Sequence, residues 1–199
     1  MPMSSSDLFV VDRPTGEADQ DTLWAEARRF AADRLGVTSI LYGFTHSRHL
    51  ATRVGMTRSL YIRHDHPADY LMRFTDGRLL DDDLCALIVL GRTGTFLWSD
   101  LGDLADQSET QRERFRIDRE AGMDVGVSIG LRFADGHGIA GFGLAARWMP
   151  APEFAARWAR QGETVVAHFT RLEPLLRRQM VAARLHLTPR QSEVLGLSV

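Results

Sequence analysis

A pair of glycine-rich apolar segments, residues 125–133 and 138–147, constrains the fold more than any other feature of this chain. The dipeptide Asp135-Gly136 lies between them, and an Asp-Gly pair between two apolar segments is a strong signal for a β-hairpin turn. Residues 37–44 and 59–63 predict a second pair of strands that also pairs as a hairpin. Because helical segments separate the two pairs, the sequence predicts an antiparallel sheet covered by helices rather than a doubly wound parallel sheet.

The remaining periodic segments predict helices. The first has Asp21 as its N-cap and ends at Gly36, and a short helix runs from Pro67 to Phe74. Three further helices are predicted for residues 82–90, 108–121 and 152–185, the last of them bent at Pro174. The predicted order is α-β-β-α-α-α-β-β-α. We therefore expect an α+β fold, an α/β/α sandwich with a central antiparallel sheet flanked by helices.

Several glycines share one face of the predicted sheet. The two-residue period of a strand places Gly126, Ser128 and Gly130 on one face, and Gly141 and Gly143 share a face of the next strand. Glycine weakens a strand, so a cluster on one face indicates that something other than its own side chains fills the space there. An internal ligand cavity and a closely packed helix are the two explanations, and we expect the cavity.

Composition limits the location and the chemistry. All 24 basic residues are arginine, and the net charge of −2 gives no general nucleic-acid-binding footprint. The absence of lysine excludes Schiff-base catalysis. Cys85 is the one cysteine, residues 1–11 are too polar for a signal peptide, and the longest apolar run, residues 84–90, is far shorter than the roughly 20 residues of a membrane span. We expect a cytoplasmic protein without a membrane segment.

Two motifs suggest catalysis or metal binding, and neither is in the required context. Residues 126–130 match the G-x-S-x-G pattern, which needs a turn between a strand and a helix, whereas a hairpin follows here. His64 and His66 point to one side of a strand, but His46, His49 and His168 do not add ligands at the spacing of a metal site. We predict a protein that is not an enzyme and has no cofactor or metal.

Two further segments allow more than one interpretation. The triplet Asp81-Asp82-Asp83 is typical of a solvated run or a helix cap, although one buried member could accept hydrogen bonds from Tyr70, Trp98 or a ligand. Residues 187–195 begin a helix with Thr188 as N-cap and Pro189 at the first position. This is either a short C-terminal helix docked on the domain or the start of a further domain.

Together these segments resemble the LuxR-type quorum-sensing transcriptional regulators. The resemblance spans residues 21–199 and rests on the motifs at residues 66–70, 96–100, 121–123 and 187–195, together with Phe74 and Asp83. It implies an N-terminal domain that binds acyl-homoserine lactones and a C-terminal helix-turn-helix that binds DNA. We accordingly expect a loose arm over residues 1–20, an autoinducer-binding domain over 21–185, and the truncated start of a helix-turn-helix domain over 186–199.

The resemblance also implies roles for individual residues. Asp83 would accept a hydrogen bond from the ligand amide, Trp98 would pack on the lactone ring, and Tyr70 would donate to the lactone carbonyl in place of the usual tryptophan. Ser128 would contact the amide region. The acyl chain would be lined by Leu41, Gly43, Leu60 and Ile62, and the predicted ligand-binding set is completed by His66, Phe74, Cys85, Gly126 and Gly143.

The chain departs from the family pattern around the head group. His66 stands where a tyrosine is usual, Phe74 lacks a hydroxyl, and Leu84 replaces a proline. We expect a roomier pocket for a long or unusual acyl chain, with a non-lactone amphiphile as the alternative ligand. The expected partner is a second copy, paired through the long C-terminal helix, with DNA bound only through the missing C-terminal domain. The alternatives are a truncated regulator that inhibits a full-length partner, and a lactone-cleaving enzyme.

Overall fold

The computed structural model describes residues 18–46, 61–73, 85, 88–89, 93–101, 107–134 and 136–184. At its centre is a five-stranded sheet in which every neighbouring pair is antiparallel and the strand order is β2-β1-β5-β4-β3. The strands are β1 (Ser39–His46), β2 (Tyr61–His64), β3 (Gly94–Leu97), β4 (Gly126–Arg132) and β5 (Gly138–Ala145). The predicted α+β class with an antiparallel sheet is therefore confirmed.

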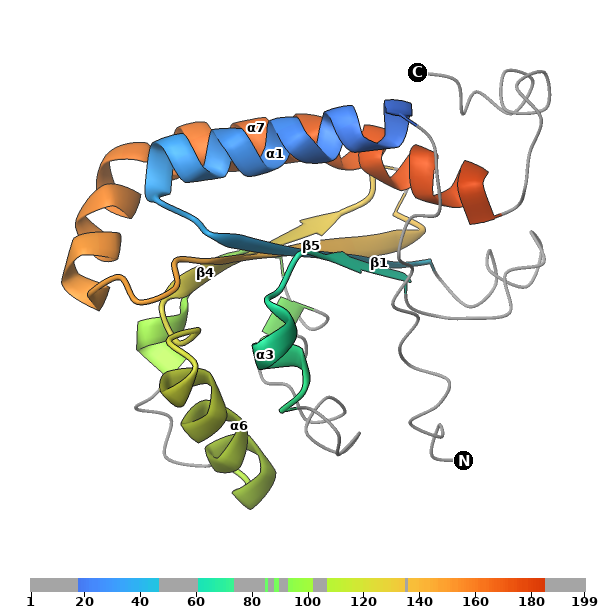
Figure 1. Cartoon of the computed structure of the whole chain (residues 1–199). Coiled ribbons are helices and arrows are strands. Elements are labelled where there is room, and N and C mark those ends of the chain that lie inside the picture. The colour runs from blue at the N-terminus through green and yellow to red at the C-terminus, as the bar shows by residue number, and fades with distance from the viewer. Residues whose placement is uncertain are drawn as a thin grey trace.

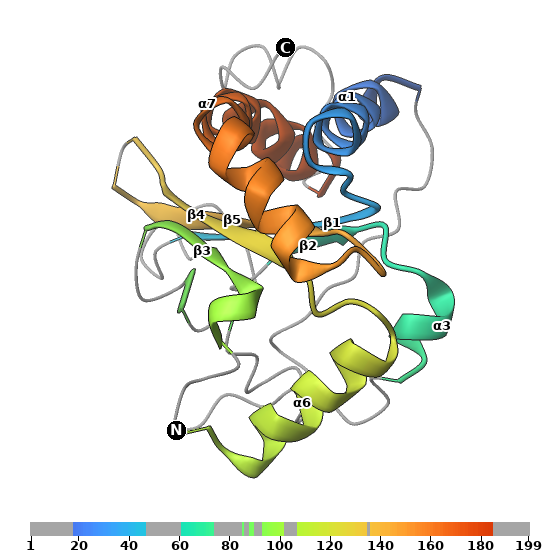
Figure 2. The ribbon, with the colours of Figure 1, turned by 90° about the vertical axis from the view of Figure 1, so that its left-hand side faces the viewer.

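Helices lie on both sides of this sheet (Figure 1). The long helices α1 (Ala18–Leu35) and α7 (Ala151–Arg184) lie side by side on one face. On the other face lie three shorter elements, α3 (Ala68–Leu71), the 3-10 helix η2 (Trp98–Leu101) and α6 (Glu109–Glu120), which Figure 2 shows from the side. Within the described ranges no helix is both long and apolar enough to cross a membrane.

Local sequence explains several of these boundaries. β4 and β5 form the predicted hairpin, with Gly136 in its turn at a φ of +73°, a conformation that glycine adopts without strain. α6 begins with a capping box, because the Ser108 hydroxyl accepts from the backbone N–H of Gln111 while the Gln111 side chain accepts from the backbone N–H of Ser108. Gly36, at a φ of +72°, follows the last residue of α1 as predicted.

Two predictions about the elements are wrong. α1 begins at Ala18, so Asp21 lies inside the helix rather than at its N-cap; no glycine or proline between them stops the helix from extending. The predicted element order has no strand between residues 90 and 108, whereas the structure has β3 (Gly94–Leu97) there. This four-residue strand lies at the sheet edge and pairs with β4 alone, so the sequence has too few residues there to show an alternating pattern.

The main core lies between the sheet and the pair α1 and α7. Phe142 stacks on Tyr42 and also packs on Phe169 of α7, each with a centroid distance of 4.7 Å. The Tyr42 hydroxyl donates to buried Glu173 over 3.0 Å, and Arg177 donates to the same carboxylate oxygen over 2.9 Å. A polar anchor thus joins β1 to α7 within this layer.

Candidate functional site

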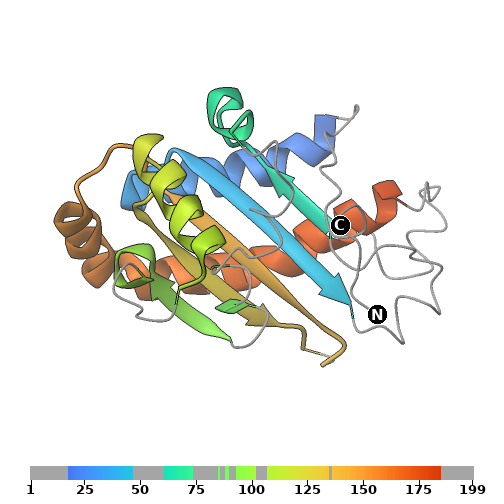
Figure 3. The same cartoon turned by 90° about the horizontal axis from the view of Figure 1, so that it is seen from below.

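The candidate site is the sheet face on the side where α3, η2 and α6 lie, which we call the sensor face (Figure 3). Residues paired across neighbouring strands share a face. Gly143 of β5 pairs with Leu41 on one side and Ser128 on the other, and Gly43 pairs with Ile62. The register therefore brings these five predicted ligand-binding residues onto one face of the sheet.

A row of glycines crosses the sensor face. Gly43, Gly141, Gly130 and Gly94 are paired in sequence across β1, β5, β4 and β3. Helical Val89 lies against the middle of the row, since a Cβ added to Gly141 would come within 2.6 Å of its Cγ1. The absence of side chains along the row lets a covering element approach the sheet backbone.

Trp98 of η2 covers a second part of the sensor face. A Cβ on Gly126 would lie 2.6 Å from the indole, and one on Gly143 would lie 3.4 Å from it. The indole N–H donates to Ser128 Oγ over 2.8 Å. Close packing of a covering residue thus explains the glycines at positions 126 and 141, whereas a Cβ at Gly143 would make only an ordinary contact with the indole. Ser128 is buried inside a strand, so the predicted interpretation of G-x-S-x-G as a strand segment is confirmed.

Tyr70 of α3 is tied to α6. Its hydroxyl donates to Asp118 Oδ1 over 2.7 Å and accepts from Arg114 over 3.0 Å. Arg114 also donates to both carboxylate oxygens of Asp118, at 3.0 and 3.1 Å. The phenol ring is buried in a small apolar cluster beside Trp98. The phenol proton is therefore already donated within the protein.

His66 lies beside Tyr70. Its Nδ1 is hydrogen-bonded to Ser39 Oγ, and its ring meets the Tyr70 ring edge-on at a centroid distance of 5.4 Å. The His64 ring stacks on the His66 ring, also at a centroid distance of 5.4 Å. Burial, followed by the charges of His64 and Arg114, lowers the pKa of His66 to about 3. The imidazole is therefore neutral at physiological pH.

One anchor of the covering elements was missed from the sequence. Arg147, just after β5, pairs with Asp69 of α3 over 2.7 Å and donates to the Ala121 carbonyl, after α6, over 2.9 Å. The Arg114–Asp118 pair was also missed, although its four-residue spacing on a helix is a recognisable sequence signal. Nothing in the sequence pattern marks Arg147.

The structure describes only some of the remaining predicted site residues. Cys85 is helical and half-buried. Leu60, Phe74 and the triplet Asp81–Asp83 lie outside the described residues, as do residues 1–17 and 185–199, so their predicted roles stay predictions. In the described part of the chain no group of three His, Cys, Asp or Glu side chains could hold a metal ion.

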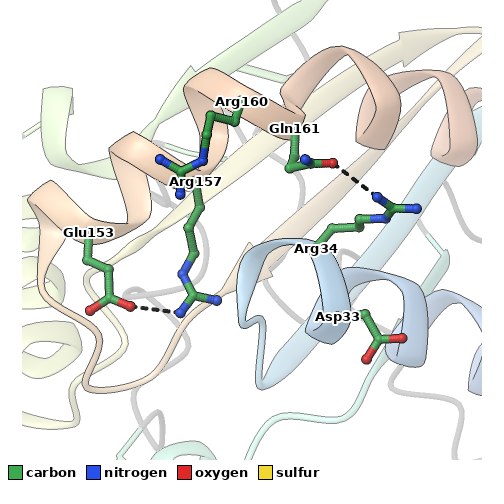
Figure 4. A pocket seen from close by; sticks show the side chains of 6 residues that line it. All are labelled: Asp33, Arg34, Glu153, Arg157, Arg160 and Gln161. Atoms are coloured by element: carbon green, nitrogen blue, oxygen red, sulfur yellow. Dashed lines mark hydrogen bonds and ion pairs between the residues drawn. The ribbon is translucent and has the colours of Figure 1, made fainter.

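Two open pockets lie away from the sensor face. The first, of about 360 Å³, lies between α1 and α7 and is lined by charged side chains, including Arg34, Glu153 and Arg157 (Figure 4). Arg157 is paired with Glu153 over 2.8 Å, and Arg34 donates to Gln161 over 3.3 Å. The second, of about 320 Å³, lies between α1 and the start of β1. Neither pocket is lined by a predicted ligand-binding residue.

Comparisons with known proteins identify the family of this chain and structures with a similar fold. The sequence model of a family described as the autoinducer binding domain matches residues 10–170. The N-acylhomoserine lactone dependent LuxR family transcription factor CepR2 from Burkholderia cenocepacia has a similar fold, with a TM-score of 0.55 at 17% identity, over 75% of this chain and 81% of that one. Escherichia coli SdiA gives a TM-score of 0.46 at 17% identity, over 85% of this chain and 78% of that one. A comparison with curated protein sequences gives no match.

Proposed function

Because the chain belongs to the autoinducer-binding domain family of LuxR-type regulators, we propose that it senses a small acylated amphiphile, with an acyl-homoserine lactone as the first candidate. The observation that carries the proposal is the packing of Trp98 on Gly126 and Gly143, with its indole N–H on Ser128. If the Trp98 indole moved away from the glycines beneath it, the space between the ring and the sheet would be flat and apolar. Apolar walls with a few polar groups are typical of small-molecule sites.

The ligand would bind between the sheet and its cover. The glycine row leads from Gly43 to Gly94, and the half-buried side chains of Leu41 and Phe96 lie on the same face. An acyl chain would replace Val89 above Gly141, and the polar head would lie near Trp98, Tyr70 and His66. Since these covering residues pack directly on the sheet, binding requires the cover to move outward.

The proposed mechanism couples binding to folding. A ligand buried between the cover and the sheet binds the folded state alone, and such a ligand raises the free energy of unfolding by mass action, by about 2.7 kcal/mol at a hundredfold excess over Kd. The amount of folded protein would then report the concentration of the signal. No catalytic step is proposed.

Thermal melting of the purified protein with N-acyl-homoserine lactones of increasing chain length tests the proposal. We expect the melting temperature to rise with ligand, and the rise to shrink in Trp98→Phe. Trp148→Phe is the matched control, since Trp148 is 66% exposed beyond the end of β5. A melting temperature that no acylated amphiphile changes contradicts the proposal.

The domain bounds, DNA binding, pairing of two copies and location stay predictions. We propose an autoinducer-binding domain over residues 21–185, with residues 186–199 as the start of a helix-turn-helix domain through which DNA would be bound. Pairing of two copies through α7 and a cytoplasmic location are likewise proposed from the family assignment. Sedimentation of the purified protein tests the pairing directly.

A further inference from the structure

The way in which α3 and α6 are attached to the sheet bears on how the cover of the sensor face opens. We propose that these two helices form one unit that turns about Gly122, where Arg147 pins both of them, so that the cover opens at the start of α6. This inference rests on the proposed function, because that function requires the cover to move outward. It makes Arg147 a positioning residue, which holds the cover without touching the ligand.

The first step is that side-chain contacts join the two helices. The Tyr70 hydroxyl of α3 donates to Asp118 of α6 over 2.7 Å and accepts from Arg114 over 3.0 Å. Arg73, just after α3, pairs with Glu120 over 3.4 Å. A hydrogen bond to a carboxylate is roughly twice as strong as one between neutral groups, and the Asp118 side chain is only 14% exposed. We therefore expect α3 and α6 to move together.

The second step is that both helices join the sheet at the same end. α3 follows the end of β2, and α6 leads into the start of β4. Ser39 and Gly126 both pair with Ala145, and the backbone N–H of Asp65, just after β2, donates to the Ile40 carbonyl. In Figure 2 the last turn of α6 lies nearer to the sheet than its first turn. The start of α6 is therefore the end with more room to move.

The third step is the side chain that fixes the attached end. Arg147, just after β5, pairs with Asp69 of α3 over 2.7 Å and donates to the Ala121 carbonyl, after α6, over 2.9 Å. One guanidinium thus holds both helices against the end of β5. Gly122 comes next in the chain, at a φ of +66°, which glycine adopts without strain. A residue at the end of a helix is the kind of position that absorbs the backbone change of a hinge.

The fourth step is the cost of the movement. Tyr70, Ala121, Met123 and Ala145 form a buried apolar cluster at the attached end. A rotation about this end leaves the cluster packed, whereas lifting the two helices away as a whole would expose it to water. Because exposure of apolar surface is unfavourable in proportion to its area, rotation is the less costly way for the cover to move outward.

A contact near the start of α6 holds the unit in its present position. The Gln107 side chain, just before α6, donates to the Leu101 carbonyl at the end of η2 over 2.7 Å. η2 is in turn bonded to the sheet, since the Trp98 indole donates to Ser128. The bond from Gln107 joins neutral groups, so it is weaker than the charge-assisted contacts of Arg147 at the other end. We therefore expect the start of α6 to be released first.

Distances between pairs of nitroxide labels, measured by pulsed electron spin resonance, test the rotation. The background is Cys85→Ser, because a native cysteine would also be labelled. Glu109→Cys and Arg119→Cys place labels at exposed positions near the two ends of α6, and Glu163→Cys provides an exposed reference on α7. Met72→Cys, at a side chain that is 76% exposed just after α3, reports on the distance between the two helices.

The ligand for this test is N-octanoyl-homoserine lactone at saturation. The positions of Glu109 and Arg119 lie about 20 Å and about 5 Å along the chain from Gly122, at the helical rise per residue. A rotation about Gly122 should therefore lengthen the distance from Glu163 to Glu109 about four times as much as the distance from Glu163 to Arg119. The distance between Met72 and Glu109 should not change.

Two substitutions test the hinge without ligand. Gln107→Ala should broaden the distances from Glu163 to Glu109 and leave those from Glu163 to Arg119 as in the wild-type protein, because it releases one end only. Arg147→Gln should broaden both sets, because it releases the attached end.

The matched control is Arg116→Gln. Arg116 pairs with Glu113 and Glu120 inside α6, so its loss should change neither distance to Glu163. With the lactone bound, Arg147→Gln should also reduce the fourfold ratio of the two displacements toward one. A residue that only stabilised the fold would lower the melting temperature and leave this ratio unchanged.

The outcomes separate this inference from the proposed function. Equal displacements of Glu109 and Arg119, a changed distance between Met72 and Glu109, or calorimetric binding of the lactone with no displacement would each overturn the inference and leave the proposed function in place. If the lactone does not bind, the proposed function is wrong for this ligand, and the ligand-free variants decide the inference. Distances like those of the wild-type protein in both Gln107→Ala and Arg147→Gln would then overturn it.

Discussion

The indole N–H of Trp98 lies 2.8 Å from the Oγ of Ser128, and this hydrogen bond joins the cover of the sensor face to the middle of the sheet. Ser128 is only 2% exposed, so the bond is shielded from water. Because the indole also packs on Gly126, the same side chain combines an apolar contact with a directional one. Single substitutions at these residues therefore test how much the contacts of Trp98 with the sheet contribute to the stability of the protein.

Ser128→Ala should lower the free energy of unfolding by about 1–3 kcal/mol, because it leaves the half-buried indole donor of Trp98 without its acceptor. Urea denaturation followed by Trp fluorescence measures the change. Ser99→Ala, at an exposed serine of η2, should change it by less than about 0.5 kcal/mol. Equal effects of the two substitutions would show that the Trp98 contact contributes nothing to stability.

The two glycines beneath Trp98 should differ in their tolerance of alanine. A Cβ at Gly126 meets both the Leu144 carbonyl oxygen and the indole, whereas a Cβ at Gly143 stays 3.4 Å from the indole. We expect Gly126→Ala to cost about 3 kcal/mol or more, and Gly143→Ala less than about 1 kcal/mol. Paired urea titrations of the two variants provide the measurement, and a Gly143 variant as unstable as the Gly126 variant would contradict the packing.

His66 should make the protein less stable in acid. Because burial holds its pKa near 3 in the fold, against 6.5 for the ordinary value, the unfolded chain binds a proton that the folded chain does not. This contribution is fully present above about pH 6.5 and is lost as the pH falls toward 3. His66→Gln should flatten the dependence of unfolding free energy on pH in that window.

The control for this prediction is His137→Gln, at an exposed histidine near the β4–β5 turn. Its pH profile should follow that of the wild-type protein, measured by denaturant titration at each pH. Parallel profiles for wild type and His66→Gln would mean that His66 is not buried as a neutral ring.

Tyr42→Phe should destabilise the protein by about 1.5–3 kcal/mol, because it removes a buried hydrogen bond to the Glu173 carboxylate. A double-mutant cycle with Glu173→Gln isolates the pair, and the coupling should exceed about 0.5 kcal/mol. Burial and the Glu173 charge also raise the pKa of Tyr42. Wild-type stability should therefore fall as the pH rises above about 10, and this fall should be smaller in Tyr42→Phe.

Much of the fold was predictable because its signals are local. The Asp135-Gly136 turn predicted the hairpin of β4 and β5, and the period of the apolar residues predicted the helices that became α1, α6 and α7. β3 escaped prediction because four residues at a sheet edge carry no periodicity of their own, and only pairing with β4 makes them a strand. The start of α1 was wrong by a few residues because a good capping residue also fits inside a helix.

The candidate site likewise has some features that the sequence predicts and others that only the tertiary structure decides. The strand period by itself determined that Gly126 shares a face with Ser128, and that Gly141 shares a face of the next strand with Gly143. The role of Trp98 beside them was an expectation from the family resemblance. The tertiary structure decided which atoms meet there: Trp98 on Ser128, Val89 on Gly141, and Tyr70 on Asp118. These contacts join residues up to 52 positions apart in the chain, Val89 and Gly141 (141 − 89 = 52). Hydrogen-bond direction and packing between such segments depend on how helices and sheet come together in space, which no local pattern encodes.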